Sequence, residues 1–184
     1  MTREEGFKSL KQNLSNQNLI KHSLTVEAVM RVLARRFNED EEKWGLTGLL
    51  HDIDYDKVKN NLSQHSLVGA KMLQDLGFEE DICQAVKVHN EAHGILPQTL
   101  LEKALFVTDP LTGLIVAATL VLPSKKLVDL SPENVLNRFK EKAFARGANR
   151  EIIRKCQEYL NLKLEEFVKI GVEAIQGISN EVGL

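Results

Sequence analysis

Histidine and aspartate are the residues of this chain whose pattern could do chemistry. His51-Asp52 directly follows Gly48-Leu49-Leu50, an apolar helix end that would draw the pair toward the interior. A buried imidazole beside a carboxylate needs a counter-charge or a metal, so the sequence requires a partner there. A divalent transition metal would supply it, because imidazole and carboxylate ligands suit manganese, iron, cobalt, zinc or nickel.

Other residues that could complete such a site lie on separate predicted helices. All five histidines fall between positions 22 and 93. Each candidate is flanked by apolar residues at helical spacing, which places it on or near the core-facing side of its helix. The alternative is a set of buried histidines that are paired without any ion. The candidate ligands outside the doublet are His22, His65, His89 and Asp109.

The elements that must position these side chains are predicted to be helices. Thr2 and Glu5 have the spacing of a capping box, and Asn18 and Asp40 are candidate caps of the next two helices. Pro110 is expected to interrupt the helical pattern after Asp109. No stretch alternates with a period of two residues, so we expect an all-α fold. Helices are predicted over about 3–14, 19–37, 40–50, 63–76, 79–91, 99–108, 111–122, 132–146, 150–160 and 164–178.

Length and composition predict one compact domain that covers residues 1–184, with 43% hydrophobic residues. The net charge of −2 gives no general attraction to nucleic acid or to an anionic membrane. Cys83 and Cys156 are isolated, which fits a reducing, cytoplasmic location. No apolar signal region is present at the N-terminus and 111–122 is too short to cross a bilayer, so no membrane partner is expected. A homodimer is compatible with this composition.

The order of the candidate ligands resembles a known signature. His22, then His51-Asp52, then Asp109 match the H…HD…D pattern of the HD-domain superfamily of metal-dependent phosphohydrolases. The local sequences HSLTVEAVMRVLA, GLLHDID and ALFVTD agree with it. His65 in QHSLVGAKML resembles one of the two extra histidines of two-metal members, as does His89 in AVKVHNEAHG. The resemblance covers an HD core of about 15–122 and leaves 123–184 as a C-terminal helical extension.

This resemblance implies a fold, a site and a reaction. One or two divalent ions would bind, and a metal-activated hydroxide would cleave a phosphoester or phosphoanhydride of a small molecule, with a nucleotide as the expected substrate. Two alternatives stay open, a di-iron oxygenase and a non-catalytic metal-dependent ligand-binding module. Asp52 would bridge two ions, of which the first is also held by His22, His51 and Asp109 and the second by His65 and His89.

The segment after the doublet departs from the family pattern. Many HD hydrolases read HDIGK, with a lysine that neutralises phosphate charge, whereas this chain continues Ile53-Asp54-Tyr55-Asp56-Lys57. We therefore expect Lys57 to act beside Asp52 as a catalytic residue in place of that lysine. The Gly-Tyr-Pro motif of the cyclic di-GMP phosphodiesterase branch is absent after the doublet, which argues against that substrate.

Three polar residues near the candidate ligands allow two interpretations each. Asp54 and Asp56 are interpreted as a solvated acidic turn, with the alternative that Asp54 orients a ligating imidazole. His93 lies four residues after His89 and could share its helix face, but we expect it to face solvent or the edge of the substrate. The sequence HNEAH is not H-E-x-x-H, so a zinc protease is excluded.

A basic segment follows the predicted core. Residues 138–155 contain seven basic and two acidic residues in a chain of net charge −2. The favoured interpretation is a solvated face paired with acidic neighbours. The alternative assigns substrate-phosphate binding to this segment, because no lysine follows the doublet. Nucleic-acid binding is not expected, because interleaved aromatic residues are missing. The candidate phosphate-binding residues are Arg138, Lys142 and Arg146.

Overall fold

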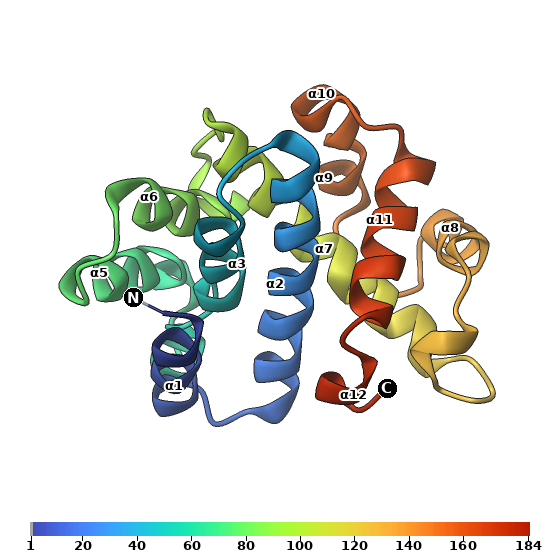
Figure 1. The fold of residues 1–184 in the computed structure, drawn as a ribbon, viewed down its shortest axis with the longest axis horizontal. Helices are drawn as coiled ribbons and strands as arrows, with labels where there is room; N and C mark the ends of the chain where they lie inside the picture. Colours follow the sequence, from blue (N-terminus) through green and yellow to red (C-terminus); the bar gives the residue numbers. More distant parts are fainter. Residues whose placement is uncertain (1) are drawn as a thin grey trace.

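The computed structural model describes residues 2–184, and every regular element in that range is helical (Figure 1). The all-α prediction is therefore confirmed. The first part of the chain contains α1 (Arg3–Asn13), α2 (Gln17–Phe37), α3 (Glu41–Leu50), α4 (Tyr55–Val58), the 3₁₀ helix η1 (Leu62–Gln64), α5 (Leu67–Asp75), α6 (Glu80–Val88) and the 3₁₀ helix η2 (Glu91–His93).

The second part begins with a long central helix and continues with shorter ones. α7 passes behind α2 and α11 in Figure 1, and both α2 and α7 are buried along much of their length. α11 packs against α2, α7 and α8. These elements are α7 (Leu100–Leu120), the 3₁₀ helix η3 (Leu127–Asp129), α8 (Pro132–Lys140), α9 (Arg150–Arg154), α10 (Cys156–Leu160), α11 (Leu164–Gln176) and α12 (Ser179–Val182).

Several of the predicted helix starts are confirmed by their caps. Thr2 and Glu5 form the capping box that begins α1, and Asp40 caps α3 by accepting from the Lys43 N–H. The predicted cap of α2 is two residues late, because Asn16 fills that position with its side-chain oxygen. The predicted helix over 63–76 begins only at Leu67, since η1 occupies the first turn.

The largest difference from the sequence prediction is at Pro110, which lies inside α7 without ending it. A proline in a helix interior removes one hydrogen bond and costs about 3 kcal/mol. Leu111, Leu114 and Ile115 are fully buried on the far side of the proline, and each contributes about 1.5–3 kcal/mol through burial. Burial therefore outweighs the proline, and the two predicted helices are one.

The continuous α7 is also long and apolar enough to cross a membrane, judged by length and composition alone. Most of it is buried among the other helices, and it packs against α2, α6, α9 and α10. It carries Asp109 at its middle. These are the properties of a core helix.

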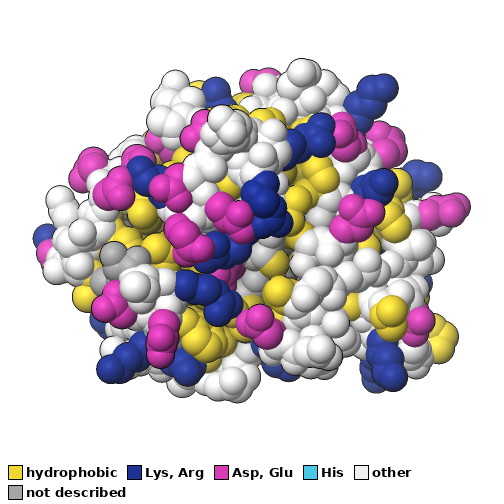
Figure 2. All heavy atoms as spheres, in the orientation of Figure 1, with side chains coloured by type: hydrophobic (Ala, Val, Ile, Leu, Met, Phe, Trp, Pro, Cys, Tyr) yellow, Lys and Arg dark blue, Asp and Glu magenta, His cyan; other side chains and the backbone are white. Residues whose placement is uncertain are grey.

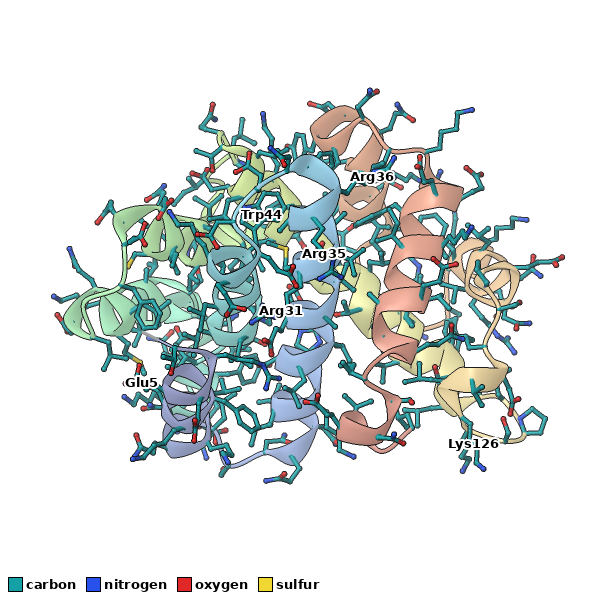
Figure 3. The ribbon with its side chains drawn as sticks, viewed as in Figure 1. Glu5, Arg31, Arg35, Arg36, Trp44 and Lys126 are labelled. Carbon is teal, nitrogen blue, oxygen red and sulfur yellow. The ribbon has the colours of Figure 1, made fainter. Side chains whose placement is uncertain are left out.

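α3 lies unusually close to α2, and that contact sets the position of the His51-Asp52 doublet. A Cβ atom at Gly48 would lie 3.0 Å from backbone atoms of α2, and one at Gly45 would collide with the Arg31 side chain. Arg31 crosses from α2 between these helices (Figure 3) and its Nε donates to Glu27, 2.9 Å away. The two glycines thus permit the close approach.

The face of the molecule in Figure 2 mixes basic, acidic and apolar side chains without a field of one sign. This agrees with the small net charge of the chain.

Candidate metal centre

Asp52 lies at the centre of a cluster of four histidines. Its Oδ1 is 3.2 Å from His65 Nε2 and 3.5 Å from His89 Nε2. Its Oδ2 is 3.3 Å from His51 Nε2 and 3.9 Å from His22 Nε2. Each carboxylate oxygen therefore faces its own pair of imidazoles, which is the arrangement needed for one aspartate to bridge two ions.

Asp109 completes one side of the cluster. Its Oδ1 is 2.9 Å from His22 Nε2 and 3.8 Å from His51 Nε2. The donor atoms of these three residues lie within 4.8 Å of one another, as do those of His51, Asp52 and His89. The structure thus brings together all six residues that the sequence analysis named, and their role as ligands stays a prediction.

Backbone carbonyls fix the two most buried histidines through hydrogen bonds to their Nδ1 atoms. His51 Nδ1 donates to the Gly48 carbonyl over 2.8 Å, and His89 Nδ1 donates to the Val86 carbonyl over 2.6 Å. A proton held on Nδ1 leaves the Nε2 lone pair directed into the cluster. Such partners fix the tautomer and orientation of a metal-ligating imidazole.

His22 is oriented by a residue that the sequence analysis missed. Thr112, one turn after Asp109 on α7, donates its hydroxyl proton to the Asp109 carbonyl over 3.0 Å. The same oxygen lies 3.4 Å from His22 Nδ1 and can accept its proton. Its spacing from Asp109 was a signal, but an isolated threonine in an apolar helix does not stand out.

Asp54 corrects the favoured interpretation of a solvated turn, because its side chain is 0% exposed. Its Oδ1 accepts from His65 Nδ1 over 2.9 Å, and its Oδ2 accepts from the Ser66 and Gly69 N–H groups over 2.9 and 2.8 Å. Ser66 has a φ of 70°, a strained conformation that these bonds support. Asp54 therefore orients the His65 imidazole, as in the alternative interpretation.

The other charged residues of this segment lie away from the cluster. Asp56 accepts from the Ser15 N–H and hydroxyl over 2.6 Å at the surface, which agrees with a role in the turn. The exposed Lys57 side chain lies 3.6 Å from Met72 Sδ on α5. The side chain therefore contacts α5 in this structure, and a catalytic role for Lys57 beside Asp52 stays a prediction.

His93 was expected at the surface or the substrate edge, but it supports His65. η2 breaks the helix after α6, so His93 does not share a helix face with His89. Its Nε2 donates to the His65 carbonyl over 2.7 Å, and Asn90 Nδ2 donates to the same oxygen over 3.3 Å. The Tyr55 ring packs edge-on against the His65 ring, with centroids 5.3 Å apart.

The donor set fits divalent transition metals. His51 Nε2 has no hydrogen-bond partner within residues 2–184. Because the ring is 0% exposed, solvent does not satisfy this nitrogen either. A buried nitrogen without a partner is costly, and an ion in the cluster would satisfy it. Four imidazoles and two carboxylates suit manganese, iron, cobalt, zinc or nickel.

A metal ion would compete with protons for the Nε2 atoms of the cluster, because its carboxylates also stabilise protonated imidazoles. Burial works against protonation of His51, but the Asp52 carboxylate outweighs it and raises the pKa of His51 to about 9. Burial opposes protonation of His65 as well, and hydrogen bonds to Asp52 and Asp54 raise its pKa to about 10. Burial disfavours charged Asp52, yet the surrounding imidazoles hold its pKa well below the usual range. His22 likewise lowers the pKa of Asp109 against its desolvation.

The cluster opens on the side of Asp109, whose side chain is 31% exposed. The loop 141–149 covers this opening and leaves a hollow on each side. The hollow of about 290 Å³ reaches His22 and Asp109, and the hollow of about 170 Å³ reaches His65, His89 and Asp109. Gly147 and Asp109 line both hollows, so the loop lies beside the exposed edge of the cluster.

The three basic residues proposed for phosphate binding do not lie together. Arg138 pairs with Glu141 over 2.9 Å, lies over the Phe144 ring and lines a different hollow, so its role in phosphate binding stays a prediction. Lys142 and Arg146 line a basic pocket next to the loop over the cluster. The predicted helix ends at Lys140 rather than near 146, which separates Arg138 from the other two.

Comparison with known proteins places this geometry in a family. The family model described as HD domain matches residues 19–114, just over half of the chain. The chain belongs to the HD-domain family. The resemblance seen in the sequence is thereby confirmed, and the buried His/Asp cluster is consistent with the metal site of this phosphohydrolase family.

The chain also resembles proteins from several organisms. It is 31% identical over 141 residues to ribonuclease Y of Lawsonia intracellularis, which covers 74% of this chain and 26% of the relative. The match to ribonuclease Y of Nitratidesulfovibrio vulgaris is 32% over 142 residues, with 74% and 27% covered. An uncharacterised protein of Methanocaldococcus jannaschii is 31% identical over 102 residues, with 53% and 59% covered. The chain spans about a quarter of the length of these ribonuclease Y relatives.

Proposed function

We propose that this HD-domain protein is a metal-dependent phosphohydrolase that cleaves a phosphoester or phosphoanhydride of a small molecule, with a nucleotide as substrate. The observation that supports it most is Asp52, whose two oxygens each face a separate pair of imidazoles. Two ions held in this way act as Lewis acids toward a phosphate and lower the pKa of water when bound.

The residues of the chain have distinct tasks in this proposal. His22, His51 and Asp109 hold one position, and His65 and His89 hold the other, with Asp52 between them. The carbonyls and Asp54 behind the imidazoles keep the Nε2 atoms directed inward. The loop 141–149 lies next to Asp109 and limits the access of water and substrate to the cluster. The chain thus supplies a buried cluster of charged side chains and a loop that narrows the access to it.

Cleavage of RNA is a second candidate function. The relatives named ribonuclease Y match about three quarters of this chain. The basic pocket beside the loop is an additional observation that favours a substrate with more than one phosphate. The chain has too little net positive charge to favour long nucleic acid on charge alone.

A panel of substrates tests the proposal. Protein loaded with Mn²⁺ or Co²⁺ is assayed with p-nitrophenyl phosphate, bis(p-nitrophenyl) phosphate, nucleotides and a short RNA, alongside Asp52→Ala and the matched surface variant Asp129→Ala. Hydrolysis that needs metal, persists in Asp129→Ala and disappears in Asp52→Ala is the expected result. Turnover of RNA alone would favour the second function.

Other outcomes would contradict the proposal. Two irons with consumption of dioxygen, measured with an oxygen electrode, would instead indicate an oxygenase. Tight nucleotide binding without hydrolysis under every metal would indicate a ligand-binding module.

A further inference from the structure

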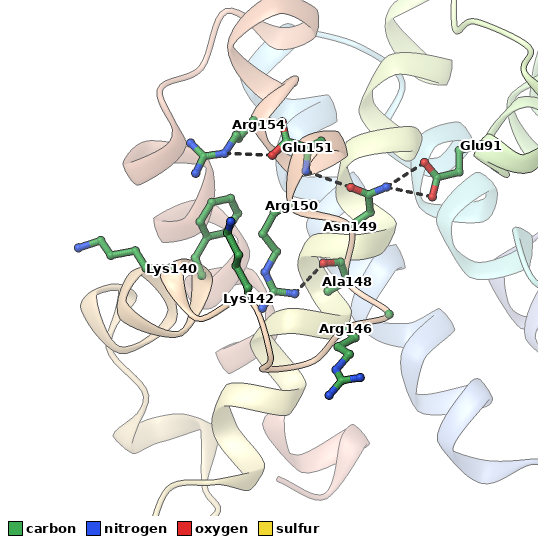
Figure 4. A pocket seen from close by; sticks show the side chains of 11 residues that line it. Glu91, Lys140, Lys142, Arg146, Ala148, Asn149, Arg150, Glu151 and Arg154 are labelled. Atoms are coloured by element: carbon green, nitrogen blue, oxygen red, sulfur yellow. Dashed lines mark hydrogen bonds and ion pairs between the residues drawn. The ribbon is translucent and has the colours of Figure 1, made fainter.

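A basic pocket of about 440 Å³ lies between the end of α8, the start of α9 and the loop 141–149 (Figure 4). Its size is in the range of small-molecule sites. Two acidic residues, Glu91 and Glu151, also line it. The cations that line it are Lys140, Lys142, Arg146, Arg150 and Arg154.

Two of these cations build the pocket. Arg150 donates to the carbonyls of Phe144, Ala145 and Ala148 over 2.6, 2.7 and 2.6 Å, so its guanidinium shapes the loop. Arg154 lies over the Phe139 ring, 4.9 Å from its centroid, and its Nε is 3.9 Å from Glu151. Both side chains are therefore held by the protein itself.

The charges of Lys142 and Arg146 are uncompensated. Within residues 2–184 neither forms an ion pair, and both side chains are exposed at the pocket. Glu91 also lines the pocket, and its two oxygens both accept from Asn149 Nδ2 over 3.0 and 2.9 Å. Cations that line one pocket without ion-pair partners can bind a phosphate group, particularly where an arginine contributes.

The basic pocket adjoins the metal centre. Glu91, Gly147 and Asn149 line both the pocket and the hollow that reaches His65, His89 and Asp109. A Cβ atom at Gly147 would meet nothing within 4 Å, so the space beside the shared wall is open. A ligand can extend from the cluster past Gly147 toward Lys142 and Arg146.

We propose that the basic pocket binds a second phosphate of the substrate, one that is not attacked. This inference rests on the proposed function and narrows its substrate class to nucleotides or short oligonucleotides with at least one additional phosphate. Lys142 and Arg146 hold that group, while the phosphate to be cleaved lies at the cluster. Substrates with a single phosphate use only the cluster.

A binding experiment tests the pocket without catalysis. Tripolyphosphate is titrated by calorimetry into chelator-treated, metal-free protein, with the double variant Lys142→Met/Arg146→Met and the matched control Lys125→Met/Lys126→Met. We expect the pocket variant to bind about tenfold more weakly or worse, and the control to bind like wild type. No binding by wild type, or equal weakening in both double variants, would overturn the inference. A thermal melt of each variant checks that it is folded.

Kinetics then separate the pocket from the proposed function. The metal-loaded protein is compared on a dinucleotide with and without a 5′-phosphate, and on nucleoside mono- and triphosphates. In the pocket variant the preference for the additional phosphate should disappear, because kcat/KM falls more for substrates that carry it than for single-phosphate substrates. Equal loss on both substrates would contradict the pocket assignment. Tripolyphosphate binding without turnover of any substrate would reject the proposed hydrolase and keep the anion site. A preference within the dinucleotide pair would identify a 5′-phosphate as the second phosphate, and a preference for the triphosphate would identify a phosphate of the triphosphate chain.

Discussion

The metal centre and the basic pocket are neighbours that are built in opposite ways. The cluster takes its side chains from α2 and α7, from the ends of α3 and α6 and from the turn between η1 and α5, and its imidazoles have hydrogen-bond partners on their Nδ1 side. The basic pocket takes long cationic side chains from a loop and two helix ends, and its Lys142 and Arg146 side chains are exposed. One region is rigid before anything binds, and the other can adjust.

This difference separates chemistry from recognition. Atoms that polarise a phosphate must be placed to within a fraction of an ångström, which helices and buried hydrogen bonds achieve. A distant phosphate needs only favourable charge and space, which flexible lysine and arginine side chains supply. We therefore expect substitutions in the cluster to act on metal binding, and substitutions in the pocket to act on substrate choice.

Asp52→Ala should have the largest effect, because it removes the one carboxylate that faces both halves of the cluster. We expect loss of both ions and of all metal-dependent activity, measured by elemental analysis and by the substrate panel. Asp129→Ala, on the exposed η3, serves as the control and should keep its metal. An Asp52→Ala protein that retains a full complement of metal would place the ions elsewhere.

Asp54→Ala should weaken metal binding indirectly, through the orientation of the His65 imidazole. It removes the acceptor of His65 and leaves the Ser66 and Gly69 N–H groups buried without partners. We expect about 10- to 100-fold weaker binding of one ion and a free energy of unfolding that is about 1–3 kcal/mol lower. Competition with a chelator measures the affinity for the ion, and urea unfolding measures the free energy of unfolding. The matched variant Asp56→Ala should change metal binding little, and equal effects in both variants would show that Asp54 has no special role.

Arg150→Met should separate the loop from the cluster. The guanidinium donates to three carbonyls of the loop, so its loss should raise hydrogen exchange over residues 144–148. Metal content should stay as in wild type. The value of kcat/KM should fall, because the loop 141–149 next to Asp109 is no longer held in place. Arg154→Met is the control. A loss of metal in Arg150→Met would show that loop and cluster form one unit.

Gly147→Val should have the smallest effect on the protein itself. The added side chain enters open space above the cluster, so stability and metal content are expected to stay the same. Substrates with bulky groups should lose more kcat/KM than p-nitrophenyl phosphate does. The same loss for large and small substrates would mean that this passage does not select by size.

The sequence predicted the cluster better than its surroundings for a physical reason. Candidate ligands such as His51 and Asp109 lie next to apolar residues with helical spacing, so burial of one helix face already directs them inward. The sequence also predicted the α1 and α3 starts, because caps at Thr2 and Asp40 act locally.

What the sequence did not show depends on contacts between distant segments. Asp54 follows a polar turn pattern, and only the approach of α5 buries it against Ser66 and Gly69. Pro110 breaks a local rule that tertiary burial of α7 overrides. Arg138 and Arg146 share a basic segment, but the chain turns after Lys140 and separates them.

The central claim is that Asp52 joins two metal positions, one of which depends on His65. The most direct test is metal per chain in wild type and His65→Ala, both purified without chelators or a histidine tag and loaded with Mn²⁺, Co²⁺ or Zn²⁺. The geometry predicts about two ions in wild type and about one in the variant, since His22, His51 and Asp109 remain in place. The same number of ions in both proteins, whether two, one or none, would contradict the two-position centre.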